Sequence, residues 1–218
     1  MRRNDLKELI EEGENQHCEF KRKFSSHEKI AREMIAFANT KGGYLLFGVD
    51  DNKDVVGVES EKTESELIKD VACNFCVPPL DYSIDYIDIN GKEVVIVEVP
   101  ESNKKPHRLQ DYKNELDINN AVVTIRVKDK SVQASKEMVR ILRAQSNNLQ
   151  LKNYSLGQDE KFVFNYLVNY ETITVKELSK AINISERRAS RTLVKLVRAN
   201  LLVIHLKDNG EEYFTSME

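Results

Sequence analysis

The chain has 218 residues, of which 40% are hydrophobic and 32% charged, and its formal net charge is −3. These values are typical of a globular protein of one or two domains. The net charge is not positive, so the overall charge does not by itself indicate nucleic-acid binding. The three cysteines argue against a disulfide scaffold and favour a reducing compartment. No stretch approaches the roughly 18 apolar residues of a membrane span, and the first residues lack a signal-peptide core, so we expect a cytoplasmic protein with no membrane partner.

Residues 1–145 predict one mixed α/β domain. Hydrophobic residues at helical spacing predict helices over 4–12, 27–41, 63–76 and 135–145. Alternating or wholly apolar runs predict strands over 17–24, 43–51, 81–89, 93–99 and 121–129. Asn90-Gly91 predicts a hairpin turn, and Thr63 with Glu66 predicts a helix-capping box. The run at 43–51 is too apolar for a half-exposed strand, so we expect it inside a sheet covered on both faces.

Residues 146–157 are polar and predict a linker, and residues 158–218 predict a second, small domain. Its helices are expected over 159–169, 174–182 and 186–201, and its strands over 201–207 and 211–216. Thr174 and Glu177 predict a capping box, and Ser185 predicts the start of the third helix. Three helices with a tight turn before the third, followed by a hairpin, describe a winged helix-turn-helix. The predicted fold class is therefore α+β, with a small C-terminal winged helix-turn-helix domain.

The third helix of this second domain concentrates positive charge, although residues 155–218 carry nine Lys and Arg against nine Asp and Glu. At about 100° per residue, one side of the helix gathers Arg187, Arg188, Arg191, Lys195 and Arg198, with Ser190 beside them. Because a helix fits the major groove and phosphates attract cations, we expect double-stranded DNA as the partner. The arginines at 187, 188 and 191 are expected to contact bases, and Lys195 and Arg198 phosphates. A solvated face, a dimerisation surface and a protein-docking surface are the alternatives.

Carboxylates flank two of the predicted strands of the first domain. Glu14 precedes the strand at 17–24 and Glu19 lies in it, while Asp50 and Asp51 end the strand at 43–51. Converging carboxylates bind Mg²⁺ or Mn²⁺ and can drive phosphodiester cleavage, which makes Glu14, Glu19 and Asp51 a candidate metal site. In the alternative interpretation Glu19 pairs with a basic residue, and the two aspartates only form a turn.

Three further motifs have a structural and a functional interpretation. Gly42-Gly43 lacks the phosphate-loop pattern, so we expect a helix terminus and close backbone approach there. Cys73 and Cys76 are half of a zinc pattern with no second half, so we expect buried helix cysteines. A basic loop is either solvated or a second polyanion contact, and it contains Lys104, Lys105, His107 and Arg108. We expect no cofactor apart from the Mg²⁺ or Mn²⁺ of the metal-site interpretation.

Four segments in this order resemble the Schlafen AlbA-type DNA-binding domain, which has also carried a divergent AAA or ATP-binding label. They are "ENQHCEFK", "IAFANTKGGYLLFGVDD" with "VVGV" after it, "VPESNKKPHRL" and "VTIRVKDKSVQAS". Many bacterial proteins that look like this join the domain to a winged helix and are described as transcriptional regulators. In nuclease members, two glutamates and an aspartate form a metal-dependent RNA-cleaving centre. Glu14 and Glu19 match the glutamates, and Asp51 matches the aspartate better than Asp50 does.

Two features depart from the nuclease members of the resembled family. The eukaryotic nucleases use two lobes and a zinc site, whereas this chain has one lobe and no complete zinc set. Residues 128–130 are Lys-Asp-Lys where many relatives carry a small Gly-Ser stretch. We therefore expect a homodimeric bacterial transcriptional regulator that binds DNA. The alternatives are a metal-dependent endoribonuclease acting on RNA and a protein-interaction module without a nucleic-acid role.

Overall fold

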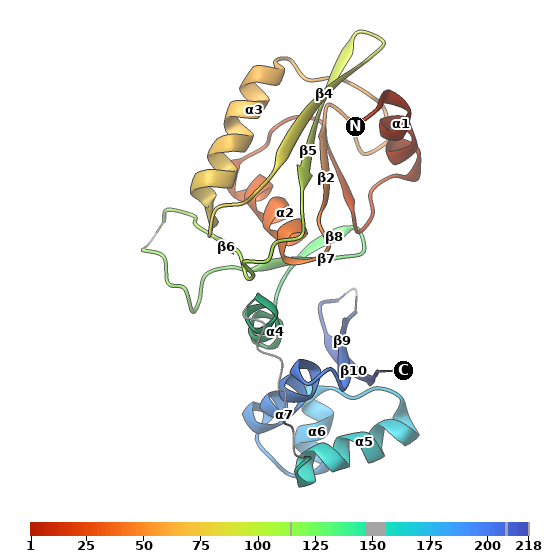
Figure 1. Ribbon diagram of the computed structural model, residues 1–218, viewed down its shortest axis with the longest axis vertical. Helices are drawn as coiled ribbons and strands as arrows, with labels where there is room; N and C mark the ends of the chain where they lie inside the picture. Colours follow the sequence, from red (N-terminus) through yellow and green to blue (C-terminus); the bar gives the residue numbers. More distant parts are fainter. Residues whose placement is uncertain (114, 147–155, 208, 218) are drawn as a thin grey trace. The chain divides into compact units, whose positions relative to one another are not determined.

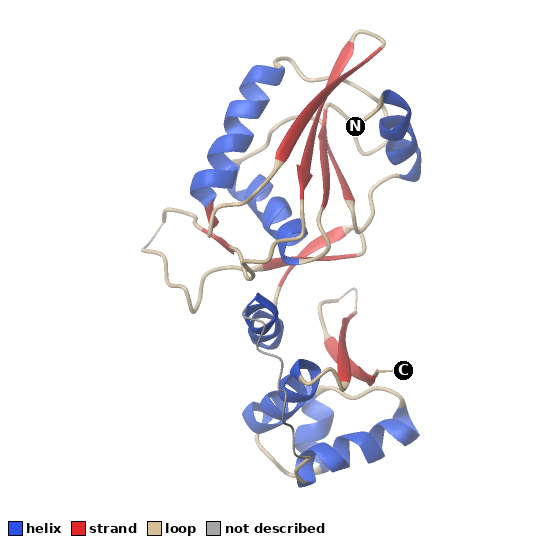
Figure 2. Ribbon diagram, viewed as in Figure 1, coloured by secondary structure: helices blue, strands red, loops and turns tan. Residues whose placement is uncertain are grey.

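The computed structural model describes residues 1–113, 115–146, 156–207 and 209–217, which form two compact units, Met1–Ala134 and Ser135–Glu218. Figure 1 follows the chain through both units, and Figure 2 separates their helices from their strands. Most of the predicted linker at 146–157 lies outside the described residues. The helix at 136–146, which we expected to close the first domain, belongs to the second unit.

The first unit is a mixed α/β fold, as predicted. Its helices are α1 (Arg3–Glu12), α2 (His27–Asn39) and α3 (Glu61–Asp70), and α3 continues into a π-helical turn, η1 (Val71–Phe75). Its longer strands are β1 (Cys18–Lys21), β2 (Gly43–Phe47), β4 (Ser83–Ile89) and β5 (Lys92–Val99). Two short antiparallel pairs complete it, one between the sequence-distant strands β3 (Cys76–Val77) and β6 (Arg108–Leu109) and one in the hairpin of β7 (Thr124–Val127) and β8 (Lys130–Gln133).

The four longer strands form one sheet in the order β1-β2-β5-β4, in which only the β1–β2 pair is parallel. The central position predicted for the apolar run at 43–51 is confirmed, since β2 lies between β1 and β5. Neighbouring side chains of β2 point to opposite faces, so Leu45 joins one hydrophobic cluster with α2 and η1, while Leu46 joins a second cluster with α1. Both faces of the sheet are therefore covered.

Local signals fix several element ends. Asn90 and Gly91 connect β4 to β5 with φ angles of 57° and 80°, which confirms the predicted hairpin turn. The N-cap of α3 is Ser60, whose hydroxyl accepts from the Thr63 amide, so the predicted capping box from Thr63 to Glu66 is wrong. The upstream Ser60 supplies an equivalent cap, three residues before the predicted capping residue Thr63.

The second unit contains α4 (Lys136–Ser146), α5 (Gln158–Tyr170), α6 (Val175–Ala181) and α7 (Glu186–Arg198), followed by the antiparallel strands β9 (Leu202–Leu206) and β10 (Glu212–Ser216). The predicted capping box of Thr174 and Glu177 and the predicted start of the third helix at Ser185 are confirmed. A core shared by α5, α6, α7 and the hairpin includes Val163, Leu178, Leu193 and Phe214. None of the helices in the described ranges has the length and apolar character that a membrane crossing requires.

Candidate functional site

Helix α7 is positioned by the short connection from α6 and by its own apolar side. Asn183 has a φ of 51° in this connection, and the Ser185 hydroxyl then caps α7 by accepting from the Arg188 amide at 3.3 Å. Ala189, Leu193 and Leu196 are fully buried in the core of the unit. Because these three residues recur every three or four positions, the opposite side of α7 is held outward.

The outward side of α7 is basic. Arg187, Arg188, Arg191 and Lys195 are exposed, and the only acidic residue of the helix is Glu186. No carboxylate of the described residues pairs with Arg187 or Arg191. These two guanidinium groups lie one helical turn apart, so they present two uncompensated charges with planar arrays of donors on one face.

Three further basic residues predicted to contact DNA are either ion-paired or partly buried. Arg188 makes a two-point ion pair with Asp159 of α5, at 2.7 and 3.0 Å, and Lys195 lies 3.2 Å from Glu160. Arg198 is only half-buried, but its Nε is buried without a hydrogen-bond partner among the described residues. The Arg188–Asp159 pair is partly exposed, and such pairs are worth about 0–1 kcal/mol, so a phosphate can displace Asp159 from Arg188 at small cost. Glu160 is buried, so displacing it from Lys195 costs more.

Ser190 does not lie on the exposed basic side. Its side chain is buried, donates to a carboxylate oxygen of Glu137 and accepts from Arg140 at 3.1 Å, and both of these partners belong to α4. The expectation that Ser190 contacts DNA is therefore wrong for this arrangement. It sits about 100° around the helix from Arg191, on the side of α7 that α4 covers.

The basic loop of the first unit is also less exposed than its sequence indicates. Lys105 is buried and donates to the Thr40 carbonyl at 3.0 Å and to Glu101 at 2.5 Å. Arg108 is buried and donates to the carbonyls of Pro106 and Ile118. His107 is 1% exposed, and burial lowers its pKa. Only Lys104 remains on the surface, so Lys105 and Arg108 do not supply the exposed polyanion contact that we expected.

The carboxylates near β1 surround a buried arginine. The side chain of Arg126, on β7, is fully buried, and its Nη1 lies 3.0 Å from Glu19 and 3.1 Å from Glu33 of α2. Its Nη2 donates to the Asn15 carbonyl at 2.7 Å, which ties the segment before β1 to β7. The second carboxylate oxygen of Glu19 accepts from Lys21. The interpretation in which Glu19 pairs with basic residues is therefore the one observed.

The predicted metal ligands lie near one another but do not present a free donor set. Glu14 accepts from the Phe20 amide at 2.9 Å, and its pKa is raised, chiefly by burial and further by the charges of Glu19 and Asp51. Within the described ranges, no three Asp, Glu, His or Cys side chains meet in the geometry of a metal site. The donor set does not fit a divalent ion in this arrangement, because two cationic side chains already neutralise Glu19.

Asp50 forms a turn, since one of its carboxylate oxygens accepts from the amides of Asn52 and Asp54 at 3.0 Å each. The paired glycines at 42–43 also have a structural explanation. A Cβ on Gly43 would lie 2.4 Å from the Phe37 ring, and Gly42 has a φ of 73°. Cys76 is buried as expected, whereas Cys73 is exposed.

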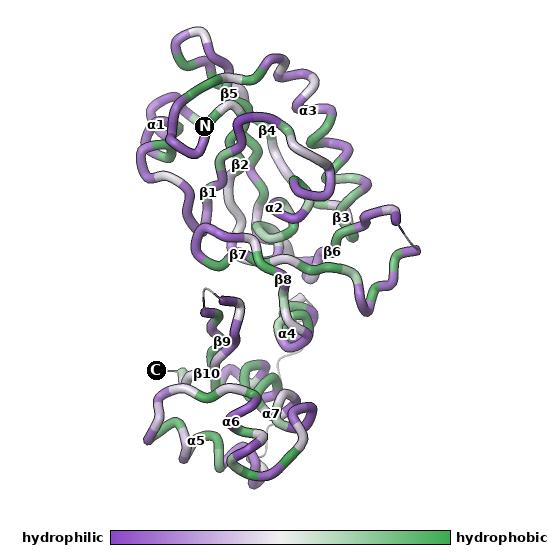
Figure 3. The backbone as a smooth tube through the Cα atoms, turned by 180° about the vertical axis from the view of Figure 1, so that it is seen from behind, coloured by the Kyte–Doolittle hydropathy of each residue, from purple (hydrophilic) through white to green (hydrophobic). Residues whose placement is uncertain are grey.

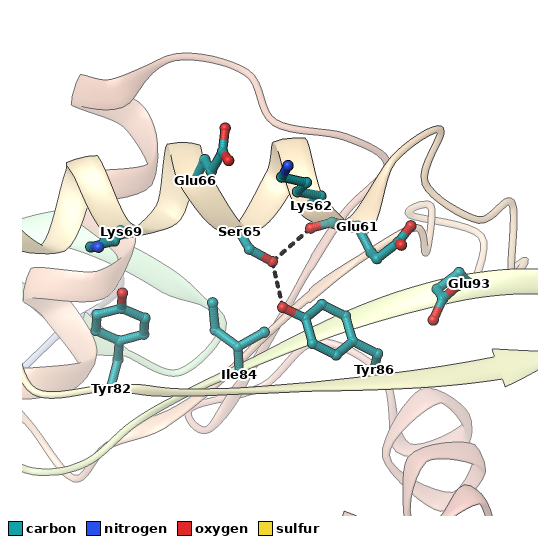
Figure 4. A pocket seen from close by; sticks show the side chains of 9 residues that line it. All are labelled: Glu61, Lys62, Ser65, Glu66, Lys69, Tyr82, Ile84, Tyr86 and Glu93. Atoms are coloured by element: carbon teal, nitrogen blue, oxygen red, sulfur yellow. Dashed lines mark hydrogen bonds between the residues drawn. The ribbon is translucent and has the colours of Figure 1, made fainter.

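A groove of about 590 Å³ runs between α3 and the edge strand β4, as Figure 4 shows. Ser65 on α3 bonds to the Tyr86 hydroxyl at 2.7 Å across it. Its charged lining residues carry both signs and are Glu61, Lys62, Glu66, Lys69 and Glu93. Because this lining is nearly balanced in charge, the groove lacks the electrostatic selectivity that a polyanion or a polycation would require.

Two sets of residues were missed from the sequence. Arg126 and Glu33 form the buried ion pair, and the signal was an arginine inside the otherwise apolar strand "VTIRV". The exposed basic residues of α4 were overlooked because this helix was assigned to the first domain.

The sequence profile of the family described as Schlafen, AlbA_2 matches residues 14–135, which is more than half of the chain. An uncharacterized ATP-binding protein of Ureaplasma parvum is 29% identical over 87 residues, covering 37% of this chain but only 24% of that protein. The N-terminal domain of a helicase RecG-related protein from Nitrosomonas europaea is 23% identical with a TM-score of 0.44, and 72% of this chain and all of that domain are covered. A Corynebacterium diphtheriae protein is 15% identical with a TM-score of 0.43, covering 92% of this chain and 34% of that one. At these TM-scores neither structural likeness bears on function.

Proposed function

The chain belongs to the Schlafen AlbA_2 family, and from this premise we propose that it is a DNA-binding regulator whose second unit is a winged helix-turn-helix. In this proposal α7 enters the major groove of duplex DNA, and β9 with β10 forms the wing. The first unit supplies dimerisation or a second nucleic-acid surface. The regulatory role is transcriptional and the protein is cytoplasmic.

The observation that carries the proposal is a pair of exposed arginines on α7 with which no carboxylate of the described residues pairs. Arg187 and Arg191 lie at the start and in the middle of an outward helix, after the short connection from α6. Arginine donates in a fixed fork that matches the O6 and N7 acceptors of guanine, and such a contact is worth about 1–3 kcal/mol. Asp159 and Glu160 of α5 pair with Arg188 and Lys195, whereas Arg187 and Arg191 keep their charges available to an anionic partner.

A two-fold dimer would suit this mode of binding. Two copies of α7 related by a two-fold axis can reach successive major grooves about 34–36 Å apart, which corresponds to a palindromic operator. Light scattering at working concentration should therefore give twice the mass of one chain. A monomeric mass would remove the dimer from the proposal and leave the role of α7 unaffected.

Fluorescence anisotropy with a labelled mixed-sequence duplex tests the role of α7. We expect Arg187→Ala/Arg191→Ala to weaken binding at least fivefold, because the loss of even one such contact removes about 1 kcal/mol or more. Arg3→Ala/Lys7→Ala is the matched control, since it removes two exposed cations at the same spacing from α1. Equal affinities for the wild type and the α7 variant would overturn the proposed function.

The endoribonuclease alternative stays a prediction. In its favour, Glu14 interacts electrostatically with both Glu19 and Asp51, so the three carboxylates of the expected centre are neighbours. Against it, Arg126 and Lys21 occupy both oxygens of Glu19. Incubation of the protein with structured RNA, in Mn²⁺ and in EDTA, decides between the nuclease alternative and the proposed regulator. Cleavage that needs the metal and disappears in Glu19→Gln would establish the nuclease.

A further inference from the structure

Helix α4 is attached to α7 by a small polar network. Ser190 of α7 donates to Glu137 and accepts from Arg140, and Arg140 also lies 3.6 Å from Glu137. At the start of α4, Ser135 donates to Glu212 of β10. The helix is thus fastened to both α7 and the hairpin, and it is part of the same compact unit.

The two sides of α4 differ in chemistry, and hydrophobic and hydrophilic stretches succeed one another along it in Figure 3. Met138, Ile141 and Leu142 are buried. The exposed side carries three basic residues at the spacing of successive helical turns, Lys136, Arg140 and Arg143. The single acidic residue of α4, Glu137, is engaged with Ser190, and no carboxylate of the described residues pairs with Lys136 or Arg143.

This helix changes the electrostatics of the second unit. Residues 155–218 alone are neutral, but residues 135–218 carry thirteen Lys and Arg against ten Asp and Glu, a net charge of +3. The first unit, residues 1–134, carries twenty against twenty-six, a net charge of −6. A polyanion is therefore attracted to the second unit. Its excess of positive charge comes from residues 135–154, which include α4.

The basic sides of α4 and α7 adjoin each other. The guanidinium of Arg140 reaches Ser190, which lies three residues after Arg187 and one before Arg191 in α7. Arg140 keeps 44% of its side chain exposed while making this contact. Arg140 therefore places the basic side of α4 next to the segment of α7 that carries Arg187 and Arg191.

We propose that α4 extends the DNA interface beyond α7, with Lys136, Arg140 and Arg143 contacting backbone phosphates. This inference rests on the proposed function, since it adds sequence-independent contacts to the base contacts assigned to Arg187 and Arg191. Exposed lysine ammonium and arginine guanidinium groups bind phosphates well, and such phosphate contacts fix the orientation of a recognition helix. The contacts lie outside the three-helix core, so they lengthen the stretch of duplex that the unit covers.

The salt dependence of duplex binding tests this inference. Each phosphate contact contributes about 0.9 to the slope of log K against log salt concentration. We expect Lys136→Ala/Arg143→Ala to lower the slope by about 1.8 and to weaken binding on the order of tenfold or more near 0.1 M KCl. Arg140 is left intact in this variant because it also anchors α4 to Ser190.

Lys62→Ala/Lys69→Ala is the matched control, because it removes two exposed cations seven residues apart from α3 in the acidic first unit. The inference is supported if the salt-dependence slope is reduced in the α4 variant and equals the wild-type slope in the control. A wild-type slope in the α4 variant overturns it, and the proposed function survives if Arg187→Ala/Arg191→Ala still weakens binding. Duplex binding by the wild type that is absent or insensitive to salt overturns both. Circular dichroism confirms that each variant is folded.

Discussion

Replacing Arg126 with methionine tests the assignment of the carboxylate cluster most sharply. Methionine keeps much of the volume and removes the charge. The guanidinium is fully buried and lies 3.0–3.2 Å from Glu19, Glu33 and Ser131 through one nitrogen. Removing one partner of a buried ion pair leaves an uncompensated charge and costs about 3–5 kcal/mol. We expect Arg126→Met to destabilise the first unit by this amount near neutral pH.

The loss of stability in Arg126→Met should depend on pH. Burial raises the pKa of Glu33, with a further contribution from Glu19, and removal of the guanidinium should raise it more. A carboxyl whose folded-state pKa lies above its unfolded value favours the folded state at low pH, and this contribution is lost as the pH rises through the folded-state pKa. The deficit of Arg126→Met should therefore be smaller near pH 5 than near pH 8.

Thiol labelling in urea measures the stability of the first unit alone, because all three cysteines lie in this unit and Cys18 and Cys76 are fully buried until it unfolds. Burial raises the pKa of Cys18 to about 12, which keeps the folded thiol unreactive. Lys113→Met is the control, since it removes a cation paired with Glu28 on the surface and should cost about 0–1 kcal/mol. Equal losses for the two variants would refute the buried pairing, as would a deficit of Arg126→Met that is independent of pH.

Three further predictions concern the fold around the two sites. Gly43→Ala should destabilise the first unit by about 1–3 kcal/mol in the same urea assay, because its Cβ would lie 2.4 Å from the Phe37 ring; an unchanged midpoint would contradict this close approach. Burial lowers the pKa of His107, so its contribution to stability is present above its ordinary pKa and is lost as the pH falls through its lowered pKa in the folded state; His107→Gln should flatten this dependence, and an unaltered pH profile would exclude the residue as its source. Ser190→Ala should lower the stability of the second unit by about 1–3 kcal/mol in thermal unfolding, because Glu137 and Arg140 lose their shared partner, and a variant as stable as the wild type would show that the network contributes nothing.

The sequence predicted features that depend on short-range physics. Asn90-Gly91 specifies its turn through positive φ angles, Thr174 and Glu177 cap α6 locally, and the wholly apolar β2 requires cover on both faces. Position along a helix was sufficient to place Arg187 and Arg191 on an outward side.

Features that depend on distant partners were not predictable in the same way. Arg126 follows Glu19 by 107 positions, and no local pattern shows that the two side chains meet in the core. The burial of Ser190 requires α4, which is more than forty residues earlier in the chain. Helix α4 has the same amphipathic pattern whichever unit it joins, so its membership could be decided only by its contacts.

The most direct measurement of the central claim is a single binding and cleavage experiment. Labelled duplex DNA and labelled structured RNA are incubated with the protein in Mn²⁺ and in EDTA, then run on native and denaturing gels. The proposed function predicts a shifted, intact DNA band in both conditions, which weakens in Arg187→Ala/Arg191→Ala. RNA fragments that appear only with Mn²⁺, without a shift of the DNA, would contradict it and would assign the chain to the metal-dependent nucleases.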